Sequence, residues 1–157
     1  MDLKELYQEI VLDHGKNPRN KKKCKDFNKK AEGHNPLCGD KVHIFLKLNK
    51  EKKVEDISFE GEGCAISIAS ASIMTETIKG KDFNVVKKIV ENFLNMLKEG
   101  SKLNTNSLSE DQNTTMMSLS GVKNFPMRVK CATLAWHTFM HAAEGKKEIA
   151  NTEKVNQ

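Results

Sequence analysis

A change in hydrophobic period at Ala65 is the feature that most constrains the fold of this chain. Before it, segments 42–49 and 54–63 are rich in β-branched and aromatic residues, and a short polar turn separates them. After it, apolar residues recur at helical spacing in three segments, 65–80, 82–100 and 126–145. Strands followed by helices predict an α+β fold, a small antiparallel sheet with helices packed on it.

The ends of the chain extend this prediction. Residues 2–13 predict an N-terminal amphipathic helix, because Asp2 and Glu5 have the spacing of a capping box. A loop follows, and segment 29–35 predicts an edge strand. The polar segment 101–115 is expected to be a loop. With 157 residues the chain fits one domain, which we place at residues 1–145, followed by a polar C-terminal tail, 146–157, that is expected to fray.

Charge and composition limit the classes of partner. The net charge of +5 and the pI of about 9.0 would suit a nucleic-acid ligand, but only two of the 26 basic residues are arginines, Arg19 and Arg128. The dispersed lysines predict a solvated surface or an acidic protein partner rather than nucleic acid. The sequence contains no run of 18 apolar residues, so it predicts no membrane span. The charged N-terminus does not resemble a signal peptide. We therefore expect a cytoplasmic protein, whose cysteines serve metals or chemistry rather than disulfides.

Three of the four cysteines lie at the boundaries of predicted elements. Cys38 is in a polar loop, Cys64 begins a helix, and Cys131 lies in the first turns of the last helix. Helix N-termini favour thiolates. Three thiolates and the carboxylate of Asp40 would complete a tetrahedral zinc site, in which the hard oxygen donor is expected to be the ligand that leaves.

Other interpretations remain open on spacing alone. The three cysteines lack C-x-x-C pairing and would also suit packing as small hydrophobic residues. Cys24, inside a lysine run, is expected to be an exposed bystander. His137 and His141 have a metal-binding spacing, but their aromatic neighbours favour a packing or surface role. Arg128 either is a solvated helix residue or compensates the negative charge of a thiolate site.

Three motifs in order resemble those of the U-type iron–sulfur cluster assembly proteins. They are "NPLCGD" (35–40), "GEGCAISIASASIM" (61–74) and "RVKCATLAWH" (128–137). The chain is similar to the SufU branch of that family rather than the IscU branch. Lys130 takes the position of a histidine in IscU-type scaffolds, "FPMRVK" replaces their chaperone-docking motif, and the segment between Gly100 and Arg128 is similar to a SufU insertion.

The resemblance implies a zinc-dependent sulfurtransferase in iron–sulfur cluster assembly. Cys38 would accept persulfide sulfur from a SufS-like, PLP-dependent cysteine desulfurase and pass it to downstream assembly machinery. Cys38, Asp40, Cys64 and Cys131 would bind Zn²⁺, and Arg128 would help to hold a displaced ligand or the partner. The resemblance leaves open whether the protein is itself an enzyme or acts as the partner of the desulfurase.

The alternative is a scaffold on which a [2Fe–2S] cluster is assembled on the same cysteines and transferred to apo-proteins. Lys130 and the insertion favour sulfur transfer. A nucleic-acid-binding zinc module is expected to have paired C-x-x-C ligands, and a zinc hydrolase is expected to have histidine ligands and a bound water. Neither pattern is present in the sequence.

Overall fold

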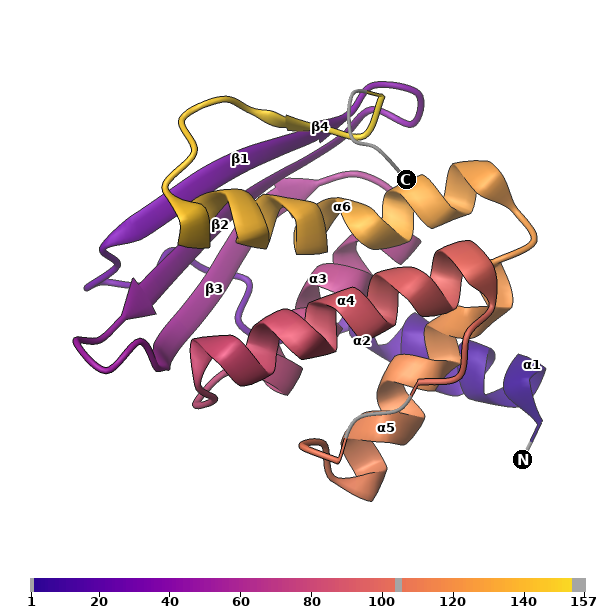
Figure 1. Ribbon diagram of the computed structural model, residues 1–157. Helices are drawn as coiled ribbons and strands as arrows, with labels where there is room; N and C mark the ends of the chain where they lie inside the picture. Colours follow the sequence, from indigo (N-terminus) through magenta and orange to yellow (C-terminus); the bar gives the residue numbers. More distant parts are fainter. Residues whose placement is uncertain (1, 104–105, 154–157) are drawn as a thin grey trace.

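A computed structural model describes residues 2–103 and 106–153, and it forms a sheet with helices packed against one face (Figure 1). The strands are β1 Lys29–Asn35, β2 Asp40–Leu48, β3 Val54–Glu62 and β4 Ala150–Asn151. Their order is β3–β2–β1–β4. The predicted α+β class is confirmed.

The sheet is mixed rather than wholly antiparallel. The β1–β2 and β2–β3 pairs are antiparallel, whereas β4 pairs with β1 in parallel. Strand β1 is therefore covered at its C-terminal end and is not the edge strand that we expected. The expectation that the tail frays is wrong for Ala150–Asn151, because the chain turns back after the last helix and buries Ala150 completely.

The helices follow the predicted segments closely. The first runs through α1 Leu3–Leu6, a π-helical turn Tyr7–Val11 and α2 Leu12–Lys16; the others are α3 Ala65–Ile78, α4 Phe83–Glu99, α5 Glu110–Met117, a 3₁₀ turn Ser118–Val122 and α6 Pro126–Glu144. Gly100 and Gly145 end α4 and α6 in the left-handed conformation, as their positions predict. Within the described residues, no helix has both the length and the apolar character needed to cross a membrane.

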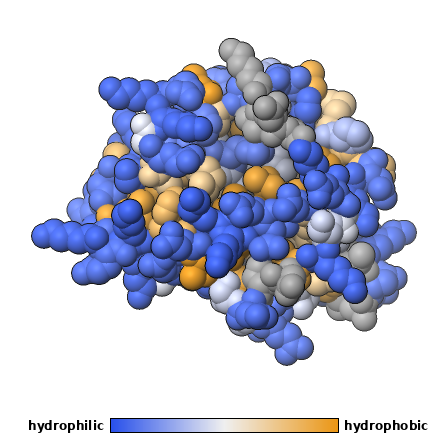
Figure 2. Space-filling view, in the orientation of Figure 1, coloured by the Kyte–Doolittle hydropathy of each residue, from blue (hydrophilic) through white to orange (hydrophobic). Residues whose placement is uncertain are grey.

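The core lies between the sheet and the helices, with α3 at its centre. The Phe93 and Trp136 rings stack with centroids 4.1 Å apart, and the Trp136 indole donates to the Ser70 hydroxyl at 2.9 Å. The small residues of α3 let the neighbouring helices approach it, and both Ser70 and Trp136 are fully buried. On the outside, Figure 2 shows a mainly hydrophilic face with hydrophobic residues in small patches.

Two local expectations are corrected by the structure. Segment 101–115 is not only a loop, because Ser109 and Gln112 form a reciprocal capping box that starts α5; residues 104–105 lie outside the described residues. Cys24 is buried rather than exposed, with 4% exposure. The segment before β1 runs along β3, where the Cys24 N–H donates to the Ser58 hydroxyl at 2.9 Å, so this side chain faces inward between solvated lysines.

Candidate metal centre

The turn between β1 and β2 presents Cys38 and Asp40 in different ways. Residues 36–39 form this turn, and Gly39 adopts the left-handed conformation with φ of +71°, which glycine allows without strain. Cys38 is exposed at the turn, whereas Asp40, the first residue of β2, is 1% exposed. The hairpin therefore offers one accessible thiol beside a buried carboxylate.

Helix α6 brings Cys131 to this hairpin. One ligand atom from each of Cys38, Asp40 and Cys131 lies within 4.8 Å of the other two. Cys131 is 3% exposed, and α6 packs along both β1 and β2. The predicted convergence of residues far apart in the sequence is thus produced by the packing of α6 on the sheet.

Cys64 approaches the same group from the N-terminus of α3. Its N–H donates to Asp40 Oδ1 at 2.9 Å, and its sulfur lies 3.9 Å from Asp40 Oδ2. As the N-cap residue, it also accepts the Ser67 N–H on its sulfur at 3.4 Å. Gly63 permits this approach, because a Cβ at that position would overlap Asp40.

The electrostatics of the two inner cysteines are coupled. The pKa of Cys64 is lowered to about 7, first because the Cys131 thiol donates toward its sulfur and then by the backbone N–H groups of Ser67 and Ile66, while burial and Asp40 act in the opposite direction. The pKa of Cys131 is raised, first by that same interaction and then by burial. Cys64 is therefore the inner thiol that ionises first.

The donor set fits a cation that prefers sulfur. Among the described residues, the hydrogen-bond donors to the buried Asp40 carboxylate are the Asn35 amide, the Cys64 N–H and the Cys64 thiol, and none of them carries a positive charge. A buried carboxylate beside thiols that are to ionise requires a compensating positive charge. Three sulfurs and one oxygen are ligands that Zn²⁺ accepts tetrahedrally, and thiolates are also the ligands of iron–sulfur clusters.

Arg128 lies one helical turn before Cys131 on α6. Its guanidinium carbon is 4.9 Å from the centroid of the Phe125 ring, and it lines a cavity of about 460 Å³ together with Tyr7. Burial raises the pKa of Tyr7, and the Arg128 charge opposes the rise. Lys130 points elsewhere, because its ammonium pairs with the Glu153 carboxylate at 2.6 Å.

The two histidines of α6 are separate from the cysteine group. Burial lowers the pKa of His137 to about 4, and His141 Nδ1 lies 3.3 Å from the Glu148 carbonyl. These environments agree with the packing and surface roles expected from the sequence.

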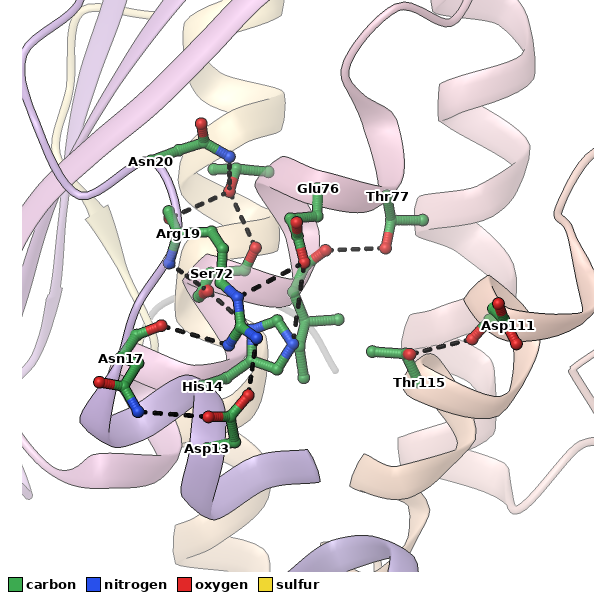
Figure 3. Close-up of polar contacts among 12 residues, drawn as sticks. Asp13, His14, Asn17, Arg19, Asn20, Ser72, Glu76, Thr77, Asp111 and Thr115 are labelled. Carbon is green, nitrogen blue, oxygen red and sulfur yellow. Dashed lines mark hydrogen bonds and ion pairs between the residues drawn. The ribbon is translucent and has the colours of Figure 1, made fainter. Parts of the chain in front are cut away.

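A polar network between α3 and α2 connects the two helices (Figure 3). The buried Ser72 hydroxyl lies 2.7 Å from His14 Nδ1 and accepts the Arg19 N–H at 2.8 Å. The Arg19 guanidinium also bonds Asp13 at 2.6 Å and lies 3.9 Å from Glu76. Figure 3 shows these side chains converging between the two helices. The network holds α2 against the helix whose first turn carries Cys64.

The structure adds Asn35, which the sequence interpretation missed. This fully buried residue pairs with Asp40 in the β1–β2 register, and its amide contacts both Asp40 and Cys131. A signal was available: if 29–35 and 40–48 are strands of one hairpin, the residues flanking its four-residue turn face each other.

Fold and site together define an α+β protein with a candidate metal centre at Cys38, Asp40 and Cys131, beside which Cys64 lies. The chain belongs to the family described as NifU-like N terminal domain, whose model matches residues 6–132. It is 42% identical over 135 residues to the zinc-dependent sulfurtransferase SufU of Bacillus subtilis, covering 86% of this chain and 87% of that protein. It is 36% identical over 153 residues to the iron–sulfur cluster assembly scaffold protein IscU of Streptococcus pyogenes, covering 98% and 90%. The predicted family resemblance is confirmed.

Solved structures agree with this assignment. A crystal structure of a SufU protein, an iron–sulfur cluster assembly scaffold candidate from Fervidobacterium islandicum, superposes with a TM-score of 0.75 at 34% identity and covers 88% of this chain and 97% of that one. The N-terminal part of a NifU-like protein from Brucella abortus has a TM-score of 0.75 at 21% identity, over 92% of this chain and 99% of that one. This second likeness concerns the fold alone.

Proposed function

We propose that this protein is a zinc-dependent sulfurtransferase of iron–sulfur cluster assembly, with Cys38 as the sulfur acceptor. The observation that carries the proposal is the contrast within the donor set: Cys38 is exposed at a turn, while Asp40 and Cys131 are buried beside it. The SufU relative, named as a zinc-dependent sulfurtransferase, supports the same activity.

Zn²⁺ would be held by Cys38, Asp40, Cys64 and Cys131, and would keep the thiols deprotonated and protected from oxidation. The burial of Asp40 favours a different leaving ligand from the one that donor hardness predicts. Donor hardness pointed to Asp40, but both of its oxygens accept hydrogen bonds inside the protein, whereas Cys38 faces solvent. We infer that Cys38 is the exchangeable ligand and that Asp40 stays.

The transfer itself is a thiol–disulfide type of exchange. The Cys38 thiolate attacks the outer sulfur of a persulfide on the partner desulfurase. A new S–S bond forms at Cys38 as the partner's S–S bond breaks, and the partner cysteine leaves as a thiolate. The transferred sulfur keeps its oxidation state, so no external oxidant or reductant is needed.

The partner of this reaction is a PLP-dependent, SufS-like cysteine desulfurase, and downstream iron–sulfur assembly machinery would receive the sulfur. Arg128 would contact this partner, and its exposure one turn before Cys131, beside the exposed Phe125, supports this role. A cytoplasmic location, where thiols stay reduced, fits these roles.

The decisive measurement is alanine production by the desulfurase with and without the zinc-loaded protein. We expect stimulation by the wild-type chain, one added sulfur atom on Cys38 by mass spectrometry, and loss of both in Cys38→Ser. Cys24→Ala is the matched control, because Cys24 is a buried thiol beside β3 and should leave the stimulation intact. Absence of stimulation by folded, zinc-loaded wild-type protein would contradict the transferase.

A scaffold for a [2Fe–2S] cluster is the second candidate, supported by the same three thiols and by the relatives named as IscU scaffolds. Anaerobic reconstitution with iron and sulfide distinguishes it. A stable cluster that transfers to an apo-protein, with no effect on desulfurase turnover, would favour the scaffold.

A further inference from the structure

Asn35 occupies an unusual place for an asparagine, fully buried at the end of β1 and between two of the metal-ligand candidates. Its Nδ2 donates to Asp40 Oδ2 at 3.1 Å and toward Cys131 Sγ at 3.5 Å. An amide nitrogen has two hydrogens, so both contacts can be made at once. The side chain therefore touches the centre from the side of the sheet.

These contacts restrict the Asp40 carboxylate. The Asn35 amide holds Oδ2, and the Cys64 N–H holds Oδ1 at 2.9 Å. With a donor on each oxygen, the carboxylate cannot rotate without breaking a buried hydrogen bond. Hydrogen bonds of this kind orient metal ligands and tune their strength.

The orientation of the Asn35 amide is itself set by the C-terminal segment. We call residues Ala150–Glu153 the C-terminal clasp. The Thr152 hydroxyl donates to Asn35 Oδ1 at 3.1 Å, and the Thr152 N–H donates to the His34 carbonyl at 3.2 Å. With its oxygen bound by Thr152, the amide must direct its nitrogen toward Asp40 and Cys131.

The clasp is attached to the rest of the protein on both sides of Thr152. Strand β4 pairs Ala150 with Gly33 and Asn151 with His34, so it lies alongside β1 (Figure 1). On the other side, the Glu153 carboxylate pairs with Lys130, the residue directly before Cys131, at 2.6 Å. The last described residues of the chain thus bridge β1 and α6, the two elements that carry Asn35 and Cys131.

We propose that Asn35 is a positioning residue for Asp40 and Cys131, and that the C-terminal clasp, through Thr152, sets its orientation. The inference rests on the metal centre of the proposed function but not on sulfur transfer. It assigns a role to residues 150–153, which lie beyond the part of the chain that the family model matches.

The test uses the full chain with Co²⁺ in place of zinc, because cobalt–thiolate absorption reports the ligand geometry, together with zinc affinity from chelator competition. We expect Asn35→Ala to shift the cobalt spectrum and to weaken zinc binding by about 10- to 100-fold, as is typical of residues that orient metal ligands. Thr152→Val removes the hydroxyl at nearly constant shape and should produce the same spectral shift with a smaller loss of affinity.

Two variants serve as controls. Thr152→Ser keeps the hydroxyl and should retain the wild-type spectrum and affinity. Lys147→Gln removes an exposed charge from the segment before the clasp, and it should also retain the spectrum. The unfolding temperature of each metal-free variant separates a loss of metal binding from a general loss of stability.

A failure of this inference can be distinguished from a failure of the proposed metal centre. If wild-type protein binds Co²⁺ through its thiols and both Asn35→Ala and Thr152→Val bind it identically, the positioning role is wrong although the metal centre stands. If the wild-type chain shows no cobalt–thiolate absorption at all, the metal centre fails and this inference fails with it.

Discussion

Asp40 and Gly63 show how a single missing side chain shapes the candidate metal centre. Gly63 has a φ of +148°, and a Cβ there would overlap the Asp40 carboxylate. The absence of a side chain lets the Cys64 N–H reach Asp40 Oδ1 at 2.9 Å. Two properties of glycine, its conformational freedom and its size, are therefore used at one position.

We predict that Gly63→Ala disrupts this contact. The added methyl group must push Asp40 or the Cys64 backbone away, so we expect at least a 10-fold loss of zinc affinity and a loss of unfolding free energy of about 1 to 3 kcal/mol. Chelator competition and denaturant unfolding measure the two effects.

Gly80→Ala is the matched control for that prediction. Gly80 also has a positive φ, of +85°, but a Cβ there would meet nothing within 4 Å. It should cost about 1 kcal/mol through backbone strain alone and leave zinc affinity unchanged. Equal zinc affinities in the two variants would show that the Gly63–Asp40 approach is unimportant.

At the scale of elements, the α2–α3 contact depends on a buried histidine. His14 is 5% exposed, lies 2.7 Å from the Ser72 hydroxyl, and has its pKa lowered to about 4, mainly by burial and further by Arg19. The unfolded chain binds the same proton with a pKa of about 6.5. The unfolded state therefore takes up more protons, and stability falls as the pH drops from about 6.5 toward 4.

We predict that this histidine makes the metal-free protein about 1 to 2 kcal/mol less stable at pH 5 than at pH 7. His14→Asn keeps a polar group near Ser72 but cannot take up the proton, so its unfolding free energy should depend less steeply on pH. His137, whose pKa is also about 4, leaves a residual dependence. Urea unfolding at several pH values measures the dependence, and a wild-type slope in His14→Asn would contradict the prediction.

At the scale of the whole molecule, the centre joins parts of the chain that are distant in sequence. The β1–β2 turn supplies Cys38 and Asp40, the start of α3 supplies Cys64, and α6 supplies Cys131. A metal bound to all four, as proposed, would hold the sheet against two helices. Metal binding and folding stability should therefore be linked.

We predict that removing the metal lowers the unfolding temperature. Zinc at a free concentration 100 times its dissociation constant should stabilise the fold by about 2.7 kcal/mol, because it binds the assembled site in preference to the unfolded chain. Calorimetry with and without chelator measures the shift. Cys64→Ser should lose most of the zinc-dependent gain and Cys24→Ala should keep it, and an equal gain in both would exclude Cys64 from the site.

Local sequence patterns were sufficient to predict five of the helices and strands and to propose the ligand candidates, but not to predict α5 or β4. The alternation before Ala65 and the helical spacing after it placed β2, β3, α3, α4 and α6 to within a few residues, because these patterns record which face of each element is buried. Glycines at 100 and 145 marked helix ends for a local reason, the left-handed cap. The three cysteine motifs identified the family before any contact was known.

Contacts between distant segments were decided only by the tertiary structure. The burial of Cys24 depends on its segment running along β3, and strand β4 depends on the chain returning to β1 after α6. The role of Asn35 requires Thr152, 117 residues away, and Cys131, 96 residues away. A sequence pattern records whether a side chain faces the core, but it does not record which distant residue it meets there, because that is set by how the finished elements pack together.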